Sequence, residues 1–324
     1  MKEITYAQAI SDAISEEMER DANVFMMGED IGEYCGAFGV SRGMLEKFGE
    51  DRIMNTPIAE QSFVGAAIGA AMVGMRPIVE IMFSDFMCVC FDELVNEAPK
   101  MRYMYGGKVK VPLVMRTAAG GGTGMAAQHS QSLEACLAHF PGLKVVVPST
   151  PYDAKGLLKT AIRDDNPVMF LEQKLLYREK GMVPEEDYEI PFGVADVKRE
   201  GTDVSIITYG RMVQMSLAAA EALEKEGVHA EVIDLRTLRP LDTETIIKSV
   251  KKTHRALIVH EAVQFGGFGG EIAGQIADSE AFYYLDAPIR RLGAADCPIP
   301  FNPTLEREAF PTVEKIVAQA KSLL

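Results

Sequence analysis

The sequence contains no tryptophan, only five histidines and five cysteines, and fewer basic than acidic residues. With 33 Lys and Arg against 47 Asp and Glu, the formal net charge is −14. That balance argues against a nucleic-acid partner, because binding a phosphate backbone needs a concentrated basic surface. No two histidines stand at metal-ligand spacing and no paired C-x-x-C set occurs, so the sequence offers no zinc site. The odd cysteine count favours reduced, mostly buried thiols.

Long hydrophobic runs are also missing. The longest, Val64–Met75, is rich in small residues and ends at Arg76, so it is too short to span a bilayer. The first 20 residues are acidic and amphipathic, unlike a signal or transit peptide. These absences predict a cytoplasmic protein. The hydrophobic share of 48% is nevertheless enough for substantial cores and excludes wholesale disorder.

Strand and helix patterns alternate along most of the chain. Short apolar runs predict strands at Val24–Met27, Pro77–Phe83, Val111–Met115, Leu143–Val147, Val168–Leu171, Val204–Thr208, Ala230–Ile233, Ala256–Val259 and Ile289–Leu292. Helical spacing predicts helices at Tyr6–Met18, Gln61–Val73, Phe86–Met104, Tyr152–Arg163, Val213–Glu226, Thr243–Lys252, Glu271–Asp278 and Thr312–Leu324, with Pro99 kinking or shortening the third. Such alternation indicates βαβ units and largely parallel sheets.

One segment interrupts this alternation. Residues 178–192 are polar and contain two prolines, which is typical of an interdomain linker. The sequence therefore predicts two α/β domains, at residues 1–177 and 193–324, joined by a linker at 178–192.

Two candidate sites are weak on their residues alone. In the glycine run 120–124, Gly122 and Gly124 together with Ala127 fit a degraded G-x-G-x-x-A pattern, but no helix obviously opens there and no acidic residue follows at the required distance. A glycine loop between sheet and helix is therefore favoured over a dinucleotide site. His260 follows the predicted strand Ala256–Val259, at the end where open α/β sheets bind ligands, and either a structural or a functional role fits it.

The most informative stretch is Asn55–Ser62. Glu60 lies between the turn-like pair Thr56-Pro57 and a helix of small residues. A carboxyl group there is expected near a helix N-terminus and partly buried, and burial raises its pKa. The spacing alone fits a helix-capping glutamate equally well.

Several motifs together resemble a known family. Taken with GED at 28–30, RPIVEIMFSDF at 76–86 and AAQHSQS at 126–132, the Glu60 stretch closely resembles the β subunit of thiamine-diphosphate-dependent 2-oxo acid dehydrogenases. Similar motifs follow at 141–146, 161–168, 232–238 and 285–289, so the resemblance covers nearly the whole chain. It implies a transketolase-like α/β fold, with an N-terminal pyrimidine-binding domain on a parallel sheet and a C-terminal transketolase-type α/β domain.

The resemblance also implies roles for individual residues. Glu60 matches the glutamate that contacts N1′ of the aminopyrimidine, where a carboxyl group favours the tautomer whose imine nitrogen removes the thiazolium C2 proton. Met82 and Phe86 are placed beside the pyrimidine, with Ile58 and Glu29 nearby. His129 matches an active-site histidine that handles protons or stabilises charge during transfer to a lipoyl group.

Relatives in this family carry a structural potassium ion bound largely by backbone carbonyls. The matching positions here are Leu113, Ala161, Ile162, Asp164 and Asn166. The turn-like run 164–167 is suited to presenting such oxygens.

A missing motif has the largest consequence for assembly. Thiamine-diphosphate enzymes anchor the diphosphate through Mg²⁺ with a Gly-Asp-Gly motif, and this sequence has none. The resemblance therefore implies a separate α subunit that supplies the Mg²⁺ and diphosphate site, an α2β2 heterotetramer, and docking of the C-terminal domain on the lipoyl acyltransferase core. Pro99 departs from relatives that often carry a small residue there.

The implied reaction is oxidative decarboxylation of pyruvate, or cleavage of acetoin, with acyl transfer to lipoamide. The runs at 102–108 and 129–135 favour the acetoin group slightly. A branched-chain 2-oxo acid dehydrogenase β subunit and a non-catalytic assembly subunit remain alternatives. A stand-alone transketolase or deoxyxylulose-phosphate synthase relative is disfavoured by the missing Gly-Asp-Gly and by the chain length.

Overall fold

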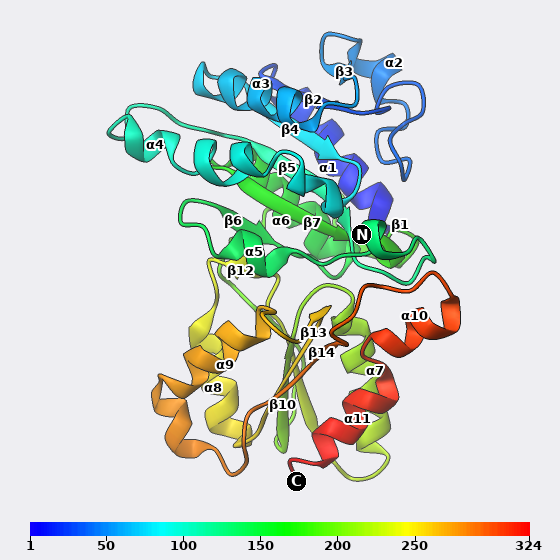
Figure 1. Ribbon diagram of the computed structural model, residues 1–324, viewed down its shortest axis with the longest axis vertical. Helices are drawn as coiled ribbons and strands as arrows, with labels where there is room; N and C mark the ends of the chain where they lie inside the picture. The colour runs from blue at the N-terminus through cyan, green and yellow to red at the C-terminus, as the bar shows by residue number, and fades with distance from the viewer. The chain divides into compact units, whose positions relative to one another are not determined.

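The chain divides into two compact units. The computed structural model describes residues 1–324 and separates unit 1, residues 1–119 and 136–192, from unit 2, residues 120–135 and 193–324 (Figure 1). The predicted linker, residues 178–192, falls within unit 1, and the segment 120–135 groups with the C-terminal residues.

Unit 1 is built on parallel strands. Their order within the unit is β6 (Lys144–Val146), β7 (Val168–Gln173), β5 (Val114–Ala119), β4 (Arg76–Ile81), β2 (Val24–Gly28) and β3 (Ile53–Asn55). The predicted strand at Val111–Met115 begins three residues late. Pro112 precedes it and has no N–H to give to a ladder.

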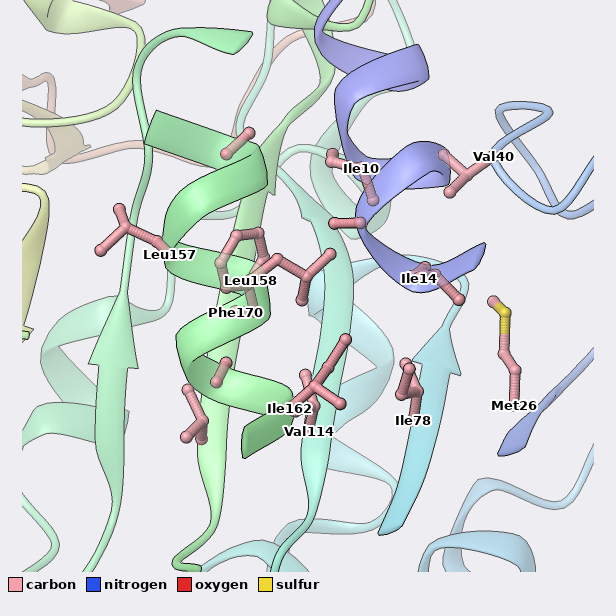
Figure 2. Packing of buried hydrophobic residues seen from close by; sticks show 14 of the residues in the cluster. Ile10, Ile14, Met26, Val40, Ile78, Val114, Leu157, Leu158, Ile162 and Phe170 are labelled. Carbon is pink, nitrogen blue, oxygen red and sulfur yellow. The ribbon is translucent and has the colours of Figure 1, made fainter. Parts of the chain in front are cut away.

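Two long helices cover one face of this sheet. They are α1 (Tyr6–Arg20), capped by Thr5, and α6 (Pro151–Arg163), capped by Thr150. Figure 2 shows Ile14 of α1 and Ile162 of α6 directed at Ile78 and Val114 of the sheet, all essentially buried. Each such side chain contributes about 1.5–3 kcal/mol through burial.

The remaining helices of unit 1 are shorter apart from α3 (Glu60–Met72), which packs on β4. The others are α2 (Met44–Phe48), η1 (Ser84–Cys88), η2 (Glu93–Glu97), α4 (Met101–Met104), α5 (Glu134–Ala138) at the boundary of the units, and η4 (Lys174–Leu176). The predicted helix Phe86–Met104 is thus broken into η1, the π-helical turn η2 and α4. Pro99 lies between the last two.

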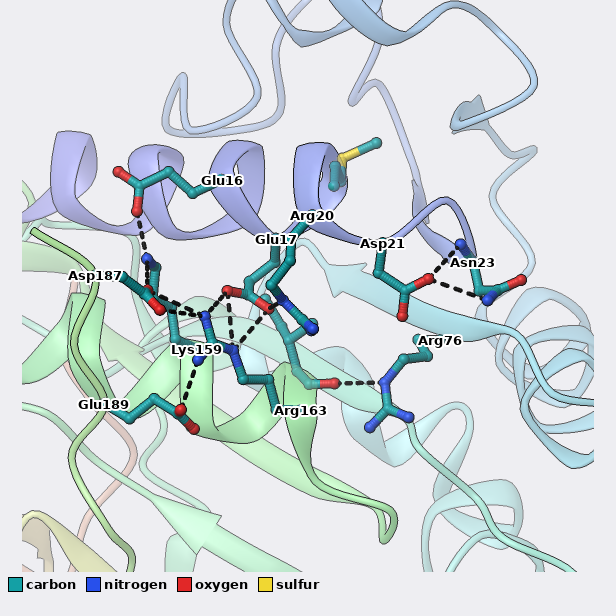
Figure 3. A network of polar contacts seen from close by, with 12 residues as sticks. Glu16, Glu17, Arg20, Asp21, Asn23, Arg76, Lys159, Arg163, Asp187 and Glu189 are labelled. Carbon is teal, nitrogen blue, oxygen red and sulfur yellow. Dashed lines mark hydrogen bonds and ion pairs between the residues drawn. The ribbon is translucent and has the colours of Figure 1, made fainter.

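The end of unit 1 is held to α1 and α6. β8 (Lys180–Val183) pairs antiparallel with β1 (Lys2–Thr5). Lys159, only 2% exposed, binds Glu16 and Asp187 at 2.5 Å each, and Arg163 binds Glu189 at 2.5 Å (Figure 3). Residues 178–192 are therefore docked on unit 1 rather than extended.

Unit 2 is a sheet between two helix layers. The strand order is β14 (Arg290–Ala294), β13 (Ala256–Val263), β10 (Val204–Thr208), β11 (Ala230–Asp234) and β9 (Asp196–Arg199), parallel except for β9. α8 (Thr243–Thr253) and α9 (Gly269–Ala277) cover one face, and α7 (Met212–Glu224) and α11 (Val313–Lys321) the other (Figure 1). Shorter elements are η3 (Ala127–His129), β12 (Thr237–Arg239), η5 (Glu280–Tyr284) and α10 (Pro303–Ala309).

Composition gave two expectations, one about membrane-spanning segments and one about the burial of the thiols. No helix has the length and apolarity needed to cross a membrane. The expectation of mostly buried thiols is wrong, since only Cys90 is buried while Cys88, Cys136 and Cys297 are exposed. Those three positions lie on irregular or short segments, where a small side chain finds little cover.

Candidate active site

The candidate site of unit 1 lies at the carboxyl ends of neighbouring strands. β2 lies between β4 and β3, so Glu29, Glu60 and Met82 follow three adjacent parallel strands. Open α/β sheets bind ligands at this edge. The backbone of this edge is tied together, because Thr56 N–H donates to Gly28 O at 3.0 Å and Gly32 N–H donates to Asn55 Oδ1 at 2.7 Å.

Glu60 is the first residue of α3 and is 7% exposed. It does not cap the helix, since Ala59 is the N-cap residue and no side chain makes a capping bond there. The structure therefore does not support the alternative that Glu60 caps the helix. Its carboxyl group still benefits from the positive end of the helix dipole.

Glu29 is the second buried carboxyl group of this edge. It is also 7% exposed, and its Oε1 has no hydrogen-bond partner. Burial, followed by the negative charges of Glu60 and Asp30, raises the pKa of Glu29 from 4.5 to about 7. The Glu29 carboxyl group is therefore partly protonated near neutral pH.

Sequence reasoning missed a third acidic residue and a thiol beside them. Burial, with the charges of Glu93 and Glu60, raises the pKa of the Cys90 thiol to about 12. Glu93 Oε2 is buried without a hydrogen-bond partner. The sequence held no signal for this proximity, because η2 is an irregular turn whose side-chain directions helical spacing does not give.

The three apolar residues predicted for the site differ in exposure. Met82 and Phe86 are partly buried at the end of β4 and on η1, and the Phe86 ring meets Phe83 edge-on at 5.9 Å. Ile58 is 85% exposed on the turn before α3. Its side chain is therefore open to a ligand or to another chain.

A buried ionic network supports this edge from within the sheet. Arg116 of β5 pairs with Glu80, directly opposite on β4, and donates to Glu172 of β7 at 2.5 and 2.7 Å. Tyr177 Oη donates to Glu172 at 2.7 Å. Glu80 also lies so close to Gly36 that a Cβ there would come within 2.6 Å of Oε1. Glu80 thereby fixes the loop that follows Glu29.

His129 lies in unit 2. It ends the turn η3 on the segment 120–131, which is closed at its base because Gly120 N–H donates to Gln131 O at 3.1 Å. The glycines of this segment bind carboxylates of their own chain. Gly121 N–H donates to Glu261 at 2.8 Å, and Glu306 accepts from Gly122 and Gly124. Amides so occupied explain why the glycine run is a loop, the favoured interpretation, rather than a dinucleotide site.

His260 is fully buried on β13. Its Nδ1 is 3.1 Å from Ala262 O, its ring is packed against Gly267 and Gly269, and burial lowers its pKa to about 4. A neutral imidazole so enclosed favours the structural role.

The five residues predicted to bind potassium meet at one end of α6, close to Arg76. Their oxygens already accept hydrogen bonds: Arg76 donates to Ile162 O at 2.8 Å and to Asp164 O at 2.7 Å, and Arg102 donates to Asn166 Oδ1 at 2.9 Å. The remaining two carbonyls, of Leu113 and Ala161, accept from backbone N–H groups. The donor set fits a hard monovalent cation in kind, and a bound ion would share its carbonyls with a guanidinium.

Comparison with known proteins decides the family. The family model of the transketolase pyrimidine-binding domain matches residues 2–180, and that of the transketolase C-terminal domain matches residues 193–316. The chain is 50% identical to the pyruvate dehydrogenase E1 component subunit beta of Rickettsia felis over 99% of this chain and 98% of that protein. It is 48% identical to the 2-oxoisovalerate dehydrogenase subunit beta of Bacillus subtilis, over 100% and 99%.

The chain belongs to the β-subunit family of 2-oxo acid and acetoin dehydrogenases. A third relative, the acetoin:2,6-dichlorophenolindophenol oxidoreductase subunit beta of Cupriavidus necator, is 49% identical over 100% of this chain and 98% of that protein. Among solved structures, a split-gene transketolase described as an inactive β4 tetramer has a TM-score of 0.82 at 24% identity, covering 99% and 98% of the two chains. That structure confirms the predicted transketolase-like fold.

The site residues of this β-subunit family member fit the pyrimidine half of thiamine diphosphate. An aminopyrimidine presents hydrogen-bonding nitrogens on a flat ring. Unit 1 offers the two carboxyl groups of Glu29 and Glu60, one with an unpartnered buried oxygen, and the apolar residues Met82 and Phe86 follow a strand of the same sheet edge. No cluster of His, Cys, Asp or Glu in the chain has the form of a metal site.

Proposed function

We propose that this chain is the β subunit of a thiamine-diphosphate-dependent dehydrogenase. In this proposal it takes part in oxidative decarboxylation of pyruvate, or in cleavage of acetoin, with acyl transfer to lipoamide. The observation that carries the proposal is the pair of buried carboxyl groups, Glu29 and Glu60, at the carboxyl edge of a pyrimidine-binding domain.

Thiamine diphosphate, when bound, supplies an acidic C2–H and an electron sink for cleavage of the bond next to a carbonyl. Glu60 holds a proton at the pyrimidine N1′, which is the position the family resemblance assigns to it. Glu29, whose pKa is about 7, is partly protonated near neutral pH and so reduces the negative charge at this edge. Met82 and Phe86 keep water from the ring, with Ile58 at the rim.

His129 is proposed to handle protons during acyl transfer to the lipoyl group. An imidazole suits this step because its ordinary pKa lies near neutral pH. Its loop is anchored in unit 2, so this step depends on residues outside the carboxyl pair.

The proposal includes partners. An α subunit would complete an α2β2 heterotetramer and supply the Mg²⁺ and diphosphate site, and the C-terminal domain would dock on the lipoyl acyltransferase core. Residues 1–177 and 193–324 are proposed as the two domains, and the cytoplasm as the location.

A structural K⁺ is proposed at Leu113, Ala161, Ile162, Asp164 and Asn166. The test is the melting temperature of the chain in K⁺ and in Na⁺. A melting temperature that is unchanged when K⁺ replaces Na⁺ would contradict that site.

The relatives leave three substrate classes open for this chain. Proteins named for pyruvate, 2-oxoisovalerate and acetoin are 50%, 48% and 49% identical to this chain. Differences so small do not rank the substrates. A branched-chain 2-oxo acid is therefore the second candidate.

The test is an assay of the reconstituted enzyme. The chain is co-expressed with its α subunit, and reduction of an artificial electron acceptor is measured with pyruvate, 2-oxoisovalerate and acetoin in turn. Turnover of one substrate at least about tenfold above the others would assign it. Inactivity on all three, in a complex that binds thiamine diphosphate, would contradict the proposed function and favour an assembly subunit.

A further inference from the structure

Two acidic residues hold the loop that carries His129. Glu306, 4% exposed on α10, accepts from Gly122 N–H at 2.8 Å through Oε1 and from Gly124 N–H at 3.0 Å through Oε2. Glu261, at the end of β13, accepts from Gly121 N–H at 2.8 Å. Bonds from N–H groups to carboxylates are about twice as strong as neutral ones. Three of the four residues 121–124 thus donate a backbone hydrogen bond to a carboxylate, and these bonds restrict the backbone of this part of the loop to one conformation.

Steric contacts fix the same segment. A Cβ on Gly121 would lie 2.4 Å from the Phe310 ring, so only glycine lets the loop approach that closely. Beyond the segment, Tyr209 Oη donates to Glu134 at 2.9 Å, which anchors the chain again after the loop closes. The loop is thus bound at both ends and along its first half.

The loop also contains a strained residue. Ala126, three residues before His129, has φ +63° and ψ −163°, a region populated almost only by glycine. Such a conformation costs about 1–3 kcal/mol and persists only where surrounding contacts impose it. The contacts on this loop include the bonds of Glu306 and Glu261 to the preceding glycines and the bond from Gly120 N–H to Gln131 O. The bonds to Glu306 end two residues before Ala126 and so help to hold a backbone path that an alanine does not favour.

We propose that Glu306 and Glu261 are positioning residues that hold the His129 loop for acyl transfer. The proposal rests on the proposed function of His129. The clamp is built entirely from unit 2, since α10 and β13 hold a loop inserted in the chain between β5 and α5. A well-placed group contributes to a reaction through its orientation, so loosening the loop would lower the rate of the step that His129 serves.

The experiment compares Glu306→Ala, Glu306→Gln and His129→Ala in the holoenzyme with its α subunit. Glu308→Ala is the matched control, because Glu308 lies on the same helix with its side chain 69% exposed. Three quantities are measured: amide hydrogen exchange of residues 120–131, acyl transfer to a lipoyl domain, and decarboxylation with an artificial electron acceptor.

In Glu306→Ala the amides of the loop should exchange at least about tenfold faster, because two charge-assisted bonds are lost. Acyl transfer should fall by about tenfold or more, with artificial-acceptor turnover nearly retained. Glu306→Gln keeps one good acceptor oxygen and should fall between, while Glu308→Ala should match the wild type. Unchanged loop exchange in Glu306→Ala, or faster exchange with normal acyl transfer, would overturn the proposal.

The two hypotheses fail separately. If His129→Ala transfers acyl groups at the wild-type rate, the proposed role of His129 is wrong, and loop exchange in Glu306→Ala still decides whether the clamp exists. If Glu306→Ala does not fold, Glu261→Ala tests the same loop through Gly121. Normal amide hydrogen exchange of the loop in that variant would show that Glu261 does not hold the loop.

Discussion

At the scale of single residues, the chemistry of this protein depends on carboxyl groups whose surroundings differ. Glu29 and Glu60 are buried next to one another without a basic partner, which raises the pKa of Glu29. Glu306 and Glu261 are buried against backbone N–H groups. A glutamate therefore holds a proton more readily in one place and anchors a loop in the other.

The first prediction concerns the pH dependence of stability through Glu29. Its folded-state pKa of about 7 lies above the ordinary 4.5, so the folded chain holds a proton that the unfolded chain releases between these values. The stability that this proton provides is complete below about pH 4.5 and is lost as pH rises through about 7. Glu29→Gln mimics the protonated form. It should therefore melt increasingly above the wild type as pH rises over that range.

The measurement is the melting temperature of the two proteins as a function of pH. Glu33→Gln is the control, because Glu33 is exposed four residues further on. Parallel melting profiles for Glu29→Gln and wild type would show that Glu29 has an ordinary pKa, and the account of the carboxyl pair would be wrong.

At the scale of elements, one buried charge network joins β4, β5 and β7, and β4 is also one of the strands that end at the site. Arg116 of β5, 2% exposed, is the only cation that joins Glu80 of β4 to Glu172 of β7. Because Glu80 also abuts Gly36, the network connects the interior of the sheet with the loop that begins at Glu29.

Arg116→Met should destabilise the protein by about 3–5 kcal/mol, because it leaves two buried carboxylates without a counter-charge. Adding Glu80→Gln and Glu172→Gln removes those charges and should restore part of the loss. Denaturant unfolding of the single and triple variants measures both effects. A triple variant no more stable than Arg116→Met would show that unpaired charge is not the cause.

Much of the fold and part of the site are predictable from sequence for physical reasons. Apolar runs fix the strands, and residues that follow parallel strands must meet at one edge, which brings Glu29, Glu60 and Met82 together. Glu93 was not predictable, since a π-helical turn directs it. Gly122 and Glu306, which are hydrogen-bonded to each other, are 184 residues apart in the sequence, and no local pattern links them.

At the scale of the whole molecule, two units divide the proposed work. Unit 1 has the carboxyl pair and the sheet edge, and unit 2 has His129 on its clamped loop. Neither unit contains the Gly-Asp-Gly motif for Mg²⁺ and diphosphate, and the three relatives described above are named as β subunits. The central claim is that this chain activates a cofactor whose other half a partner would hold.

The most direct test of this claim is the rate of deuterium exchange at C2 of thiamine diphosphate in the reconstituted holoenzyme, followed by proton NMR after acid quench. Glu60→Gln should slow the exchange by at least about 100-fold, because it removes the proton-sharing carboxyl group at N1′. Glu33→Gln should leave the rate unchanged, and bound cofactor is quantified in each sample. Exchange at the wild-type rate in cofactor-saturated Glu60→Gln would contradict the account.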